Sequence, residues 1–332
     1  MKKKAIFFTF IAITMVAIFA LIFTPQTDIS LQKDTNAVRI RISSVDDYVG
    51  DLQNSYFEKI LRASTYKTIS SLIFYVNSTG TYIPNLDSAF YEVILNGTIN
   101  KVSIDSITGK KIMYNSTLIN WSQMIIKVAK DTLNVNTTIV IENVSVYQTK
   151  PWSIDSRLVL SFDVLSNAAE WARKNVSIIT EISIEGLYDP YYLVNTNRKY
   201  TNQIKKSSLD NNKWNISNLR DQLRNDTYIH WQQSGAPTFL MRFTNTTTNS
   251  SCCGIESLVN PNKLSQSDQR ESYVDYLFWS HTYNNPANCT QLYNITNPST
   301  GGGIWDEFRY FKLDLIHVVE YRIKNQDIIG NC

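Results

Sequence analysis

The chain has 332 residues, more than one average domain, and a formal net charge of only +3. Hydrophobic residues make up 43% and aromatic residues 12% of it, which excludes a disordered stalk, because such segments lack the apolar surface for a core. No block of Lys or Arg follows Lys4, so nucleic acid is not an expected partner. These values predict a folded protein.

The N-terminus carries the first clear pattern. Three lysines are followed by an uncharged run from Ala5 to Phe23. As a helix this run would extend about 28 Å, the thickness of a bilayer core. Because positive charge flanks one side only, we expect a cytoplasmic tail at 1–4, a transmembrane helix at 5–24, and a single-pass cell-membrane protein with an extracellular remainder and the lipid bilayer as a partner. A cleaved signal peptide is the alternative, and it also exports the body of the chain.

Glycosylation sequons agree with export. Chance would produce about six N-x-[Ser/Thr] triplets at this composition, whereas the chain has thirteen. A bulky glycan has to face water, so these asparagines are predicted to lie on an exported surface. The alternative is that Asn, Ser and Thr are simply abundant in loops. The predicted glycosylation sites are Asn77, Asn96, Asn115, Asn120, Asn136, Asn143, Asn175, Asn215, Asn225, Asn245, Asn249, Asn288 and Asn294.

The four cysteines are Cys252, Cys253, Cys289 and Cys332. An even number in an oxidising compartment predicts two disulfides. Neighbouring cysteines do not readily bond to each other without strain, so Cys252 and Cys253 are each expected to reach Cys289 or Cys332, with the pairing open. The histidines are isolated in the sequence, so no metal or cofactor site is predicted.

From Ser43 the apolar residues follow a helical period. Ser44 and Asp47 are typical of a capping box, and no Pro interrupts the pattern before Pro84. We therefore expect a long amphipathic helix in a membrane-proximal segment, residues 25–76, with its apolar stripe covered by the ectodomain or by a neighbouring chain. The predicted stripe consists of Val45, Val49, Leu52, Tyr56, Ile60, Ala63, Ile73 and Val76.

Residues 77–194 are predicted to form the α+β core of the ectodomain. Helices are expected at 86–95 and 118–133. Their buried candidates include Ala89, Val93, Ile119, Met124 and Val128.

Strands are expected in the second half of this core. The first covers 138–148, and the second covers 152–164, where apolar and polar residues alternate and Asp155 and Asp163 face water as solvated charges. A short helical linker is expected at 167–174, followed by a third strand near 176–184. The three strands predict an antiparallel meander with helices on its apolar face.

Residues 195–332 are predicted to be a C-terminal, β-containing and disulfide-linked part. A short helix is expected near 217–224, and strands are expected at 239–243, 273–279 and 311–323, the last with a helix as its alternative. His317 falls on an apolar face, where a hydrogen-bonded core residue is commoner than a catalytic base.

The motifs of common enzymes are missing from the sequence. It has no G-x-S-x-G elbow and no local nucleophile–base pair. The run Gly301–Gly303 lacks the following Lys-[Ser/Thr] of a phosphate loop and is interpreted as a flexible turn. Asp155 and Asp163 are too far apart along one strand for a glycosidase pair. No catalytic residue is predicted.

Two resemblances extend this interpretation. The lysine-rich start, the single apolar helix, Pro25 at its outer edge and the long amphipathic helix resemble pilin-like proteins of type IV systems. The resemblance implies processing near Lys4-Ala5-Ile6, although Phe10 stands where that family usually carries Glu. The segments 96–98, 151–152 and 186–191 resemble an uncharacterised group of archaeal single-pass surface proteins, which implies location and class only.

Together these patterns predict an α+β fold with an N-terminal transmembrane helix and a long amphipathic helix packed on an antiparallel β-sheet ectodomain. The leading functional hypothesis is a non-enzymatic, membrane-anchored, N-glycosylated surface protein, pilin-like or adhesin-like, with envelope or filament subunits as partners. The alternative is an exported hydrolase or glycan-processing enzyme with dispersed catalytic residues. A concave pocket with paired carboxylates of raised pKa would favour that alternative.

Overall fold

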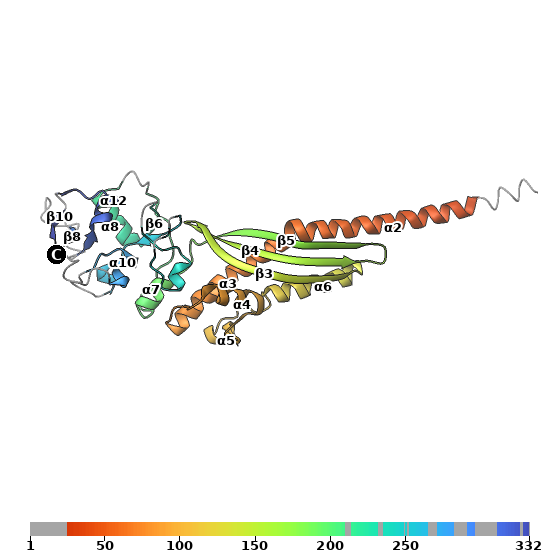
Figure 1. Ribbon diagram of the computed structural model, residues 1–332, viewed down its shortest axis with the longest axis horizontal. Coiled ribbons are helices and arrows are strands. Elements are labelled where there is room, and N and C mark those ends of the chain that lie inside the picture. The colour runs from red at the N-terminus through yellow and green to blue at the C-terminus, as the bar shows by residue number, and fades with distance from the viewer. Residues whose placement is uncertain are drawn as a thin grey trace, which may run out of the picture. The chain divides into compact units, whose positions relative to one another are not determined.

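Figure 1 shows the computed structural model of the chain. Its residues fall into two compact units. Among the described residues, unit 1 comprises those within 25–57, 125–140 and 161–176, and unit 2 comprises those within 58–124, 141–160 and 177–331. The residues that the structure describes are 25–209, 214–231, 235–248, 250, 252–264, 271–281, 291–295, 311–325 and 328–331.

Helices and antiparallel sheets make up both units, so the predicted α+β class is confirmed. The predicted membrane span, residues 5–24, lies outside the described residues. Within the part of the chain that is described, no helix combines the length and the apolar character that a bilayer crossing requires. This finding contradicts the predicted transmembrane helix and, with it, the predicted cell-membrane localisation.

A long helical segment opens the described chain. It consists of α2 (Pro25–Asp51), a π-helical turn η1 (Leu52–Tyr56) and α3 (Phe57–Thr79). The backbone stays helical through η1, because Asp51 and Phe57 on its two sides both have right-handed helical dihedrals. Ser44 lies inside α2 and its hydroxyl donates to the Ile40 carbonyl at 3.0 Å, so the predicted capping box does not start a helix there.

The buried positions of this segment shift by one residue at η1. Five members of the predicted stripe are buried: Val45, Val49, Leu52, Ile73 and Val76. Tyr56, Ile60 and Ala63 are not, and Phe57 and Leu61 are buried instead. A π turn holds one residue more than an α turn, which rotates the following side chains by about 100°. The assumption of one uniform helical period is therefore wrong in the middle of the segment.

Three long strands form the main sheet: β3 (Asn136–Lys150), β4 (Ser153–Leu165) and β5 (Glu170–Ser183). Their order is β3-β4-β5, and the short connections make the sheet an antiparallel meander, as predicted. Figure 1 shows the three strands side by side. Burial alternates along most of β3 and along the C-terminal half of β5, as expected of strands with one covered face.

The predicted helical linker at 167–174 is wrong, because β5 already begins at Glu170. The connection is a tight turn that Ser166 closes. Its hydroxyl oxygen accepts hydrogen bonds from the N–H groups of Ala168 and Ala169 at 3.2 and 3.0 Å. A local side-chain acceptor thus replaces the helical bonds that the linker was expected to make.

The helical segment packs on the sheet within each unit. In unit 1 the rings of Phe57 and Phe162 lie 5.4 Å apart, and the Trp171 indole donates to Asp46 at 3.1 Å. In unit 2 the α3 residue Arg62 donates through Nε to the Thr180 hydroxyl on β5 at 3.1 Å. The predicted packing of a long helix on an antiparallel sheet is therefore observed.

Smaller elements complete the first half of unit 2. They are α4 (Leu86–Asn96), the hairpin β1 (Thr98–Ile99) and β2 (Val102–Ser103), α5 (Ile104–Thr108) and the start of α6 (Leu118–Leu133). The helices predicted at 86–95 and 118–133 are thus confirmed as α4 and α6. The Asn85 side chain caps α4 by accepting from the Ser88 N–H at 3.0 Å, and Gly97 ends the helix with a φ of 71° that glycine adopts readily.

The predicted buried face is correct for α4 but wrong for α6. Ala89 and Val93 are buried on α4. On α6, by contrast, Ile119, Met124 and Val128 are 39, 48 and 52% exposed. The apolar stripe of α6 is broad; Leu118 and Ala129 near its centre are buried, whereas Ile119, Met124 and Val128 lie towards its edges.

The C-terminal part of unit 2 is built from short elements. They are α7 (Pro190–Asn195), α8 (Ile216–Asn225), β6 (Tyr228–Ile229), the 3-10 turn η3 (Met241–Phe243), β7 (Glu256–Ser257), α9 (Pro261–Leu264), α10 (Asp275–Ser280), β8 (Leu292–Ile295), β9 (Lys312–Asp314), α12 (Leu315–Glu320) and β10 (Ile328–Asn331). Two small antiparallel sheets have the orders β6-β7 and β10-β8-β9. A buried core joins α8, α10 and β8 through aromatic and aliphatic side chains, including Trp214, Leu219, Phe278, Ile295 and Tyr321.

Several segments differ here from the predicted strands, and local capping explains one of these differences. The helix expected near 217–224 is confirmed as α8, whereas 239–243 contains η3 and 273–279 contains α10. The strand expected at 311–323 is short, because the Asp314 side chain accepts from the His317 N–H and starts α12.

Candidate functional site

The predicted glycosylation sites fit an exposed surface. Of the eleven that the structure describes, none is buried. Eight are exposed, while Asn77, Asn120 and Asn294 are half-buried. Asn249 and Asn288 lie outside the described residues. Modification of these asparagines therefore remains a prediction that their accessibility permits.

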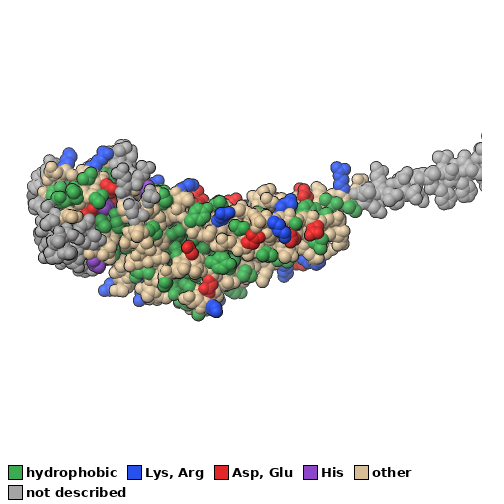
Figure 2. Space-filling view, viewed as in Figure 1, with side chains coloured by type: hydrophobic (Ala, Val, Ile, Leu, Met, Phe, Trp, Pro, Cys, Tyr) green, Lys and Arg blue, Asp and Glu red, His purple; other side chains and the backbone are tan. Residues whose placement is uncertain are grey.

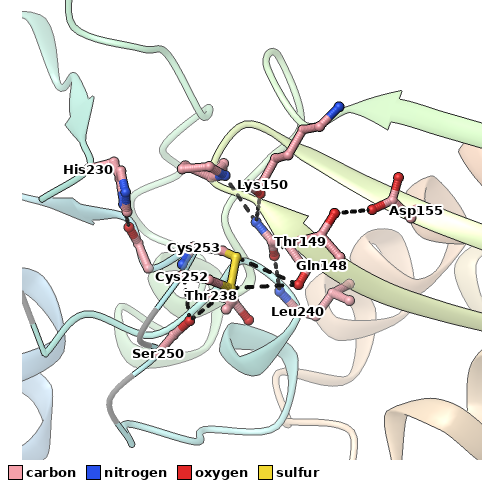
Figure 3. Close-up of a disulfide and its surroundings, with 12 residues drawn as sticks. Gln148, Thr149, Lys150, Asp155, His230, Thr238, Leu240, Ser250, Cys252 and Cys253 are labelled. Carbon is pink, nitrogen blue, oxygen red and sulfur yellow. Dashed lines mark hydrogen bonds between the residues drawn. A yellow bond between two sulfur atoms is a disulfide. The ribbon is translucent and has the colours of Figure 1, made fainter. Parts of the chain in front are cut away.

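The cysteine pairing differs from the prediction. Cys252 and Cys253 are joined to each other in a disulfide between neighbouring residues, with Cα atoms 3.8 Å apart (Figure 3). The expectation that each reaches a distant cysteine is therefore wrong, while Cys289 and Cys332 lie outside the described residues. The Sγ atom of Cys253 is buried 3.7 Å from the carbonyl oxygen of Gln148, at the end of β3. The closed ring thus packs against the main sheet.

Two clusters of buried charged groups lie on the short ribbon β6-β7. Within β7, Glu256 and Ser257 are both fully buried. Successive residues of a strand point to opposite faces, so these two side chains enter different surroundings. Ser257 joins a cluster centred on Arg242, the arginine cluster, and Glu256 joins a cluster centred on His317, the histidine cluster.

The arginine cluster is a cation between two carboxylates. Arg242 in η3 is fully buried, and its Nη1 donates to Asp189 at 2.7 Å and to Asp275 at 2.9 Å. Its Nη2 also donates to the carbonyl of Ile255. Each carboxylate also accepts a hydrogen bond from a hydroxyl group. Tyr228 donates to Asp189 at 2.8 Å, and Ser257 donates to Asp275 at 2.8 Å.

Charge compensation in this cluster is local. Burial alone would lower the pKa of the Arg242 guanidinium, but the carboxylates of Asp189 and Asp275 outweigh it and hold that pKa well above its usual value. The guanidinium also lies over the rings of Tyr191 and Tyr228, 5.6 and 5.7 Å from their centroids. The cluster links η3, α7, α10 and β6, so it is interpreted as a structural element.

The histidine cluster places one imidazole among three carboxylates. His317 on α12 contacts Asp314 through Nδ1 at 2.7 Å and Glu256 through Nε2 at 3.3 Å. Glu320, one turn further along α12, lies with Oε2 at 3.8 Å from the same Nε2. Tyr321 donates its hydroxyl to the second oxygen of Glu256 at 2.8 Å. The prediction that His317 is a hydrogen-bonded core residue is confirmed.

Negative charge exceeds positive charge in the histidine cluster. Burial would lower the pKa of His317, but Glu256 and Asp314 raise it well above its usual value. Burial, together with the nearby Glu256, raises the pKa of Glu320 to about 7. Ionisation of Glu320 is therefore disfavoured in this arrangement.

Three cavities of unit 2 are lined by other residues than those of the two clusters. The largest, of about 600 Å³, is lined by residues that include Tyr91, Glu92 and Asn143. A second, of about 530 Å³, is lined by residues that include Glu185 and Asp226, and a third holds about 200 Å³. No residue of the arginine or histidine cluster lines these three cavities.

The two aspartates considered for glycosidase chemistry have structural partners. Asp155 is buried, not solvated as predicted, and accepts a hydrogen bond from the Thr149 hydroxyl at 2.5 Å. Asp163 pairs with Lys174 at 3.2 Å on the surface. Their interactions are thus separate.

Sequence reasoning missed most members of both clusters. The residues that meet at Arg242 come from distant segments, so no spacing could reveal them. The histidine cluster had one local signal, because His317 and Glu320 are three residues apart and share a face only in a helix. Interpreting 311–323 as a strand removed that signal.

Comparisons with known proteins give no further guide. No family model, no curated protein and no solved structure matches the chain.

Proposed function

We propose that this chain is a non-enzymatic, N-glycosylated assembly or contact protein, pilin-like or adhesin-like. The observation that carries the proposal is the packing of the long helical segment on the β3-β4-β5 meander within each unit. A helical spine on an antiparallel sheet is the arrangement that the resemblance to pilin-like proteins implies. Copies of the chain or other filament subunits are the proposed partners.

Surface features support the same proposal. The eight exposed sequon asparagines are distributed over both units, as expected of a surface that carries glycans. Lys/Arg and Asp/Glu side chains are interspersed on the face shown in Figure 2, which fits protein contact better than binding to a polyanion.

The hydrolase alternative receives less support. An enzyme of that kind would place paired carboxylates in an open cavity. Glu256 and Glu320 are such a pair, with the pKa of Glu320 raised to about 7 by burial and by Glu256, but neither lines any of the three cavities described above. We therefore retain the non-enzymatic assignment.

The exposed side of α3 provides a test. Tyr66 is 51% exposed there, and aromatic residues are enriched where proteins associate. The full glycosylated chain would be followed by sedimentation velocity over a range of concentrations and imaged by negative-stain electron microscopy. We expect oligomers or filaments, and we expect Tyr66→Ser to weaken association at least tenfold.

Ala63→Ser is the matched control, because Ala63 is exposed one turn away on the same side of α3. Association should survive in this variant. A wild-type chain that stays monomeric at every concentration would refute the pilin-like form of the proposal. Binding of that monomer to a glycan or protein array would then support the adhesin-like form of the proposal, and absence of binding would refute it. Turnover of an array glycan would instead support the hydrolase alternative.

A further inference from the structure

We propose that Glu256, His317 and Glu320 form a binding site for a divalent transition-metal cation. The inference is independent of the proposed function, because it concerns the histidine cluster alone. It assigns a ligand chemistry to side chains that the sequence did not associate.

The three ligand atoms already lie at suitable separations. The Nε2 atom of His317 is 3.3 Å from Glu256 Oε2 and 3.8 Å from Glu320 Oε2, and all three ligand atoms lie within 4.8 Å of one another. An ion with bonds of ~2.0–2.2 Å to nitrogen and oxygen holds tetrahedral ligands about 3.3–3.6 Å apart. Small side-chain adjustments would therefore bring all three onto one ion.

Neighbouring groups orient the ligands as metal sites require. The Asp314 carboxylate contacts Nδ1 of His317 at 2.7 Å, which directs Nε2 towards the two glutamates. A carboxylate bound to the far nitrogen of a metal-ligating imidazole is a recurrent arrangement, because it fixes the ring and raises its basicity. Tyr321 similarly holds the other oxygen of Glu256 at 2.8 Å. One oxygen of Glu256 is thus anchored while the other faces the site.

The charge balance favours a cation. Asp314, Glu256 and Glu320 bring three carboxyl groups to one imidazole in a buried region. The Oε2 atom of Glu320 is shielded from solvent, and among the described residues no donor hydrogen-bonds to it. A buried carboxylate without a donor is costly, and a divalent ion would satisfy it while compensating Glu256.

The ligand chemistry narrows the identity of the ion. Imidazole with carboxylates suits zinc and its first-row neighbours, whereas magnesium and calcium prefer oxygen ligands alone. Cysteines are not among the three ligands, so the site differs from a thiolate zinc centre. We therefore expect Zn²⁺ to bind in preference to Mg²⁺ or Ca²⁺.

The test uses the full chain, freed of metal by a chelator and then dialysed. Isothermal titration with ZnCl₂ should give one site per chain, and Zn²⁺ should raise Tm while equal Mg²⁺ or Ca²⁺ does not. Glu320→Gln retains the shape of the side chain and should lower Zn²⁺ affinity at least tenfold. Asp314→Asn should lower it by about 10–100-fold, the range found for groups that orient metal ligands.

Two controls separate this site from others. In chelator, Glu320→Gln should unfold at the wild-type temperature or above, because it removes a buried carboxylate, so its lost affinity would not reflect misfolding. His281→Ala should leave Zn²⁺ binding unchanged, since His281 is exposed beside Glu271 at 3.3 Å and belongs to a different surface. Absence of Zn²⁺ binding, equal binding by Glu320→Gln, or binding abolished by His281→Ala would each overturn the proposal.

Discussion

Replacing Arg242 by Met would remove the cation that Asp189 and Asp275 share. All three side chains are fully buried, so the two carboxylates would lose their compensating charge without gaining water. The Ile255 carbonyl would also lose a donor. Met has a similar length, so the change removes charge and hydrogen bonds and leaves most of the packing volume filled.

The expected cost follows from this burial. Removing one partner of a buried ion pair typically destabilises a protein by about 3–5 kcal/mol, because the remaining charge is buried and unpaired. For a unit of roughly 240 residues, each kcal/mol lowers Tm by about 2–4 °C. We therefore expect Arg242→Met to lower Tm by about 6–20 °C.

The loss should depend on pH. Burial already raises the pKa of Asp189, and without Arg242 only the hydrogen bonds from the Tyr191 N–H and the Tyr228 hydroxyl would oppose that effect. An acid whose pKa is higher in the folded state binds more protons there, so its contribution to stability falls as pH rises. The deficit of Arg242→Met should thus be smaller near pH ~4 than at pH ~7, where the Asp189 carboxyl would otherwise ionise.

Thermal and urea unfolding, followed by circular dichroism, would measure these effects. Arg157→Met is the matched control, because Arg157 donates to Ser177 at 3.0 Å on the exposed surface, and it should change stability by less than about 0.5 kcal/mol. Adding Asp189→Asn to Arg242→Met should recover part of the loss. Equal effects of Arg242→Met and Arg157→Met would refute the interpretation of the arginine cluster as a buried, charge-compensated network.

Three further predictions concern the helix, the glycans and the disulfide. Leu61→Ala should lower the free energy of unfolding in urea by about 2–5 kcal/mol, because Leu61 is fully buried. Ala63→Ser should change it by less than about 0.5 kcal/mol. Equal changes in the two variants would contradict the shift in buried positions at η1. Glycopeptide mass spectrometry should find several of the thirteen sequons modified, and an unmodified chain would count against the proposed function. The unreduced peptide that holds Cys252 and Cys253 should weigh two hydrogens less than its reduced form, whereas a cross-link to another peptide would exclude this disulfide.

Regular periodicity predicted the parts of the fold that repeat a simple pattern. The long helix, α4, α6 and the β4 strand all follow from the spacing of their apolar residues. Where tertiary packing or a single side chain decides the backbone, the same reasoning failed. Ser166 closes a turn where a helix was expected, and Asp314 starts α12 where a strand was expected.

The buried charged residues around Arg242 could not be predicted from the sequence for a different reason. Arg242 and Asp189 are separated by 53 residues, and Arg242 and Asp275 by 33, so only the folded chain makes them neighbours. Isolated charges in a sequence are normally assigned to the surface, because unpaired burial is so unfavourable. Pairing with an opposite charge reduces the cost of burial, and such pairs are seen only in the folded structure.

The π turn η1 has a consequence for variation in chain length. Between Leu52 and Tyr56 the helix holds one residue more than a regular α-helix needs. Deleting a single residue there would convert the turn to α-helix and still leave Val49 and Leu61 on their buried sides. A deletion within α3 would instead rotate every following side chain by about 100°. This turn is therefore the point in the segment at which related chains can differ by one residue and keep the same fold.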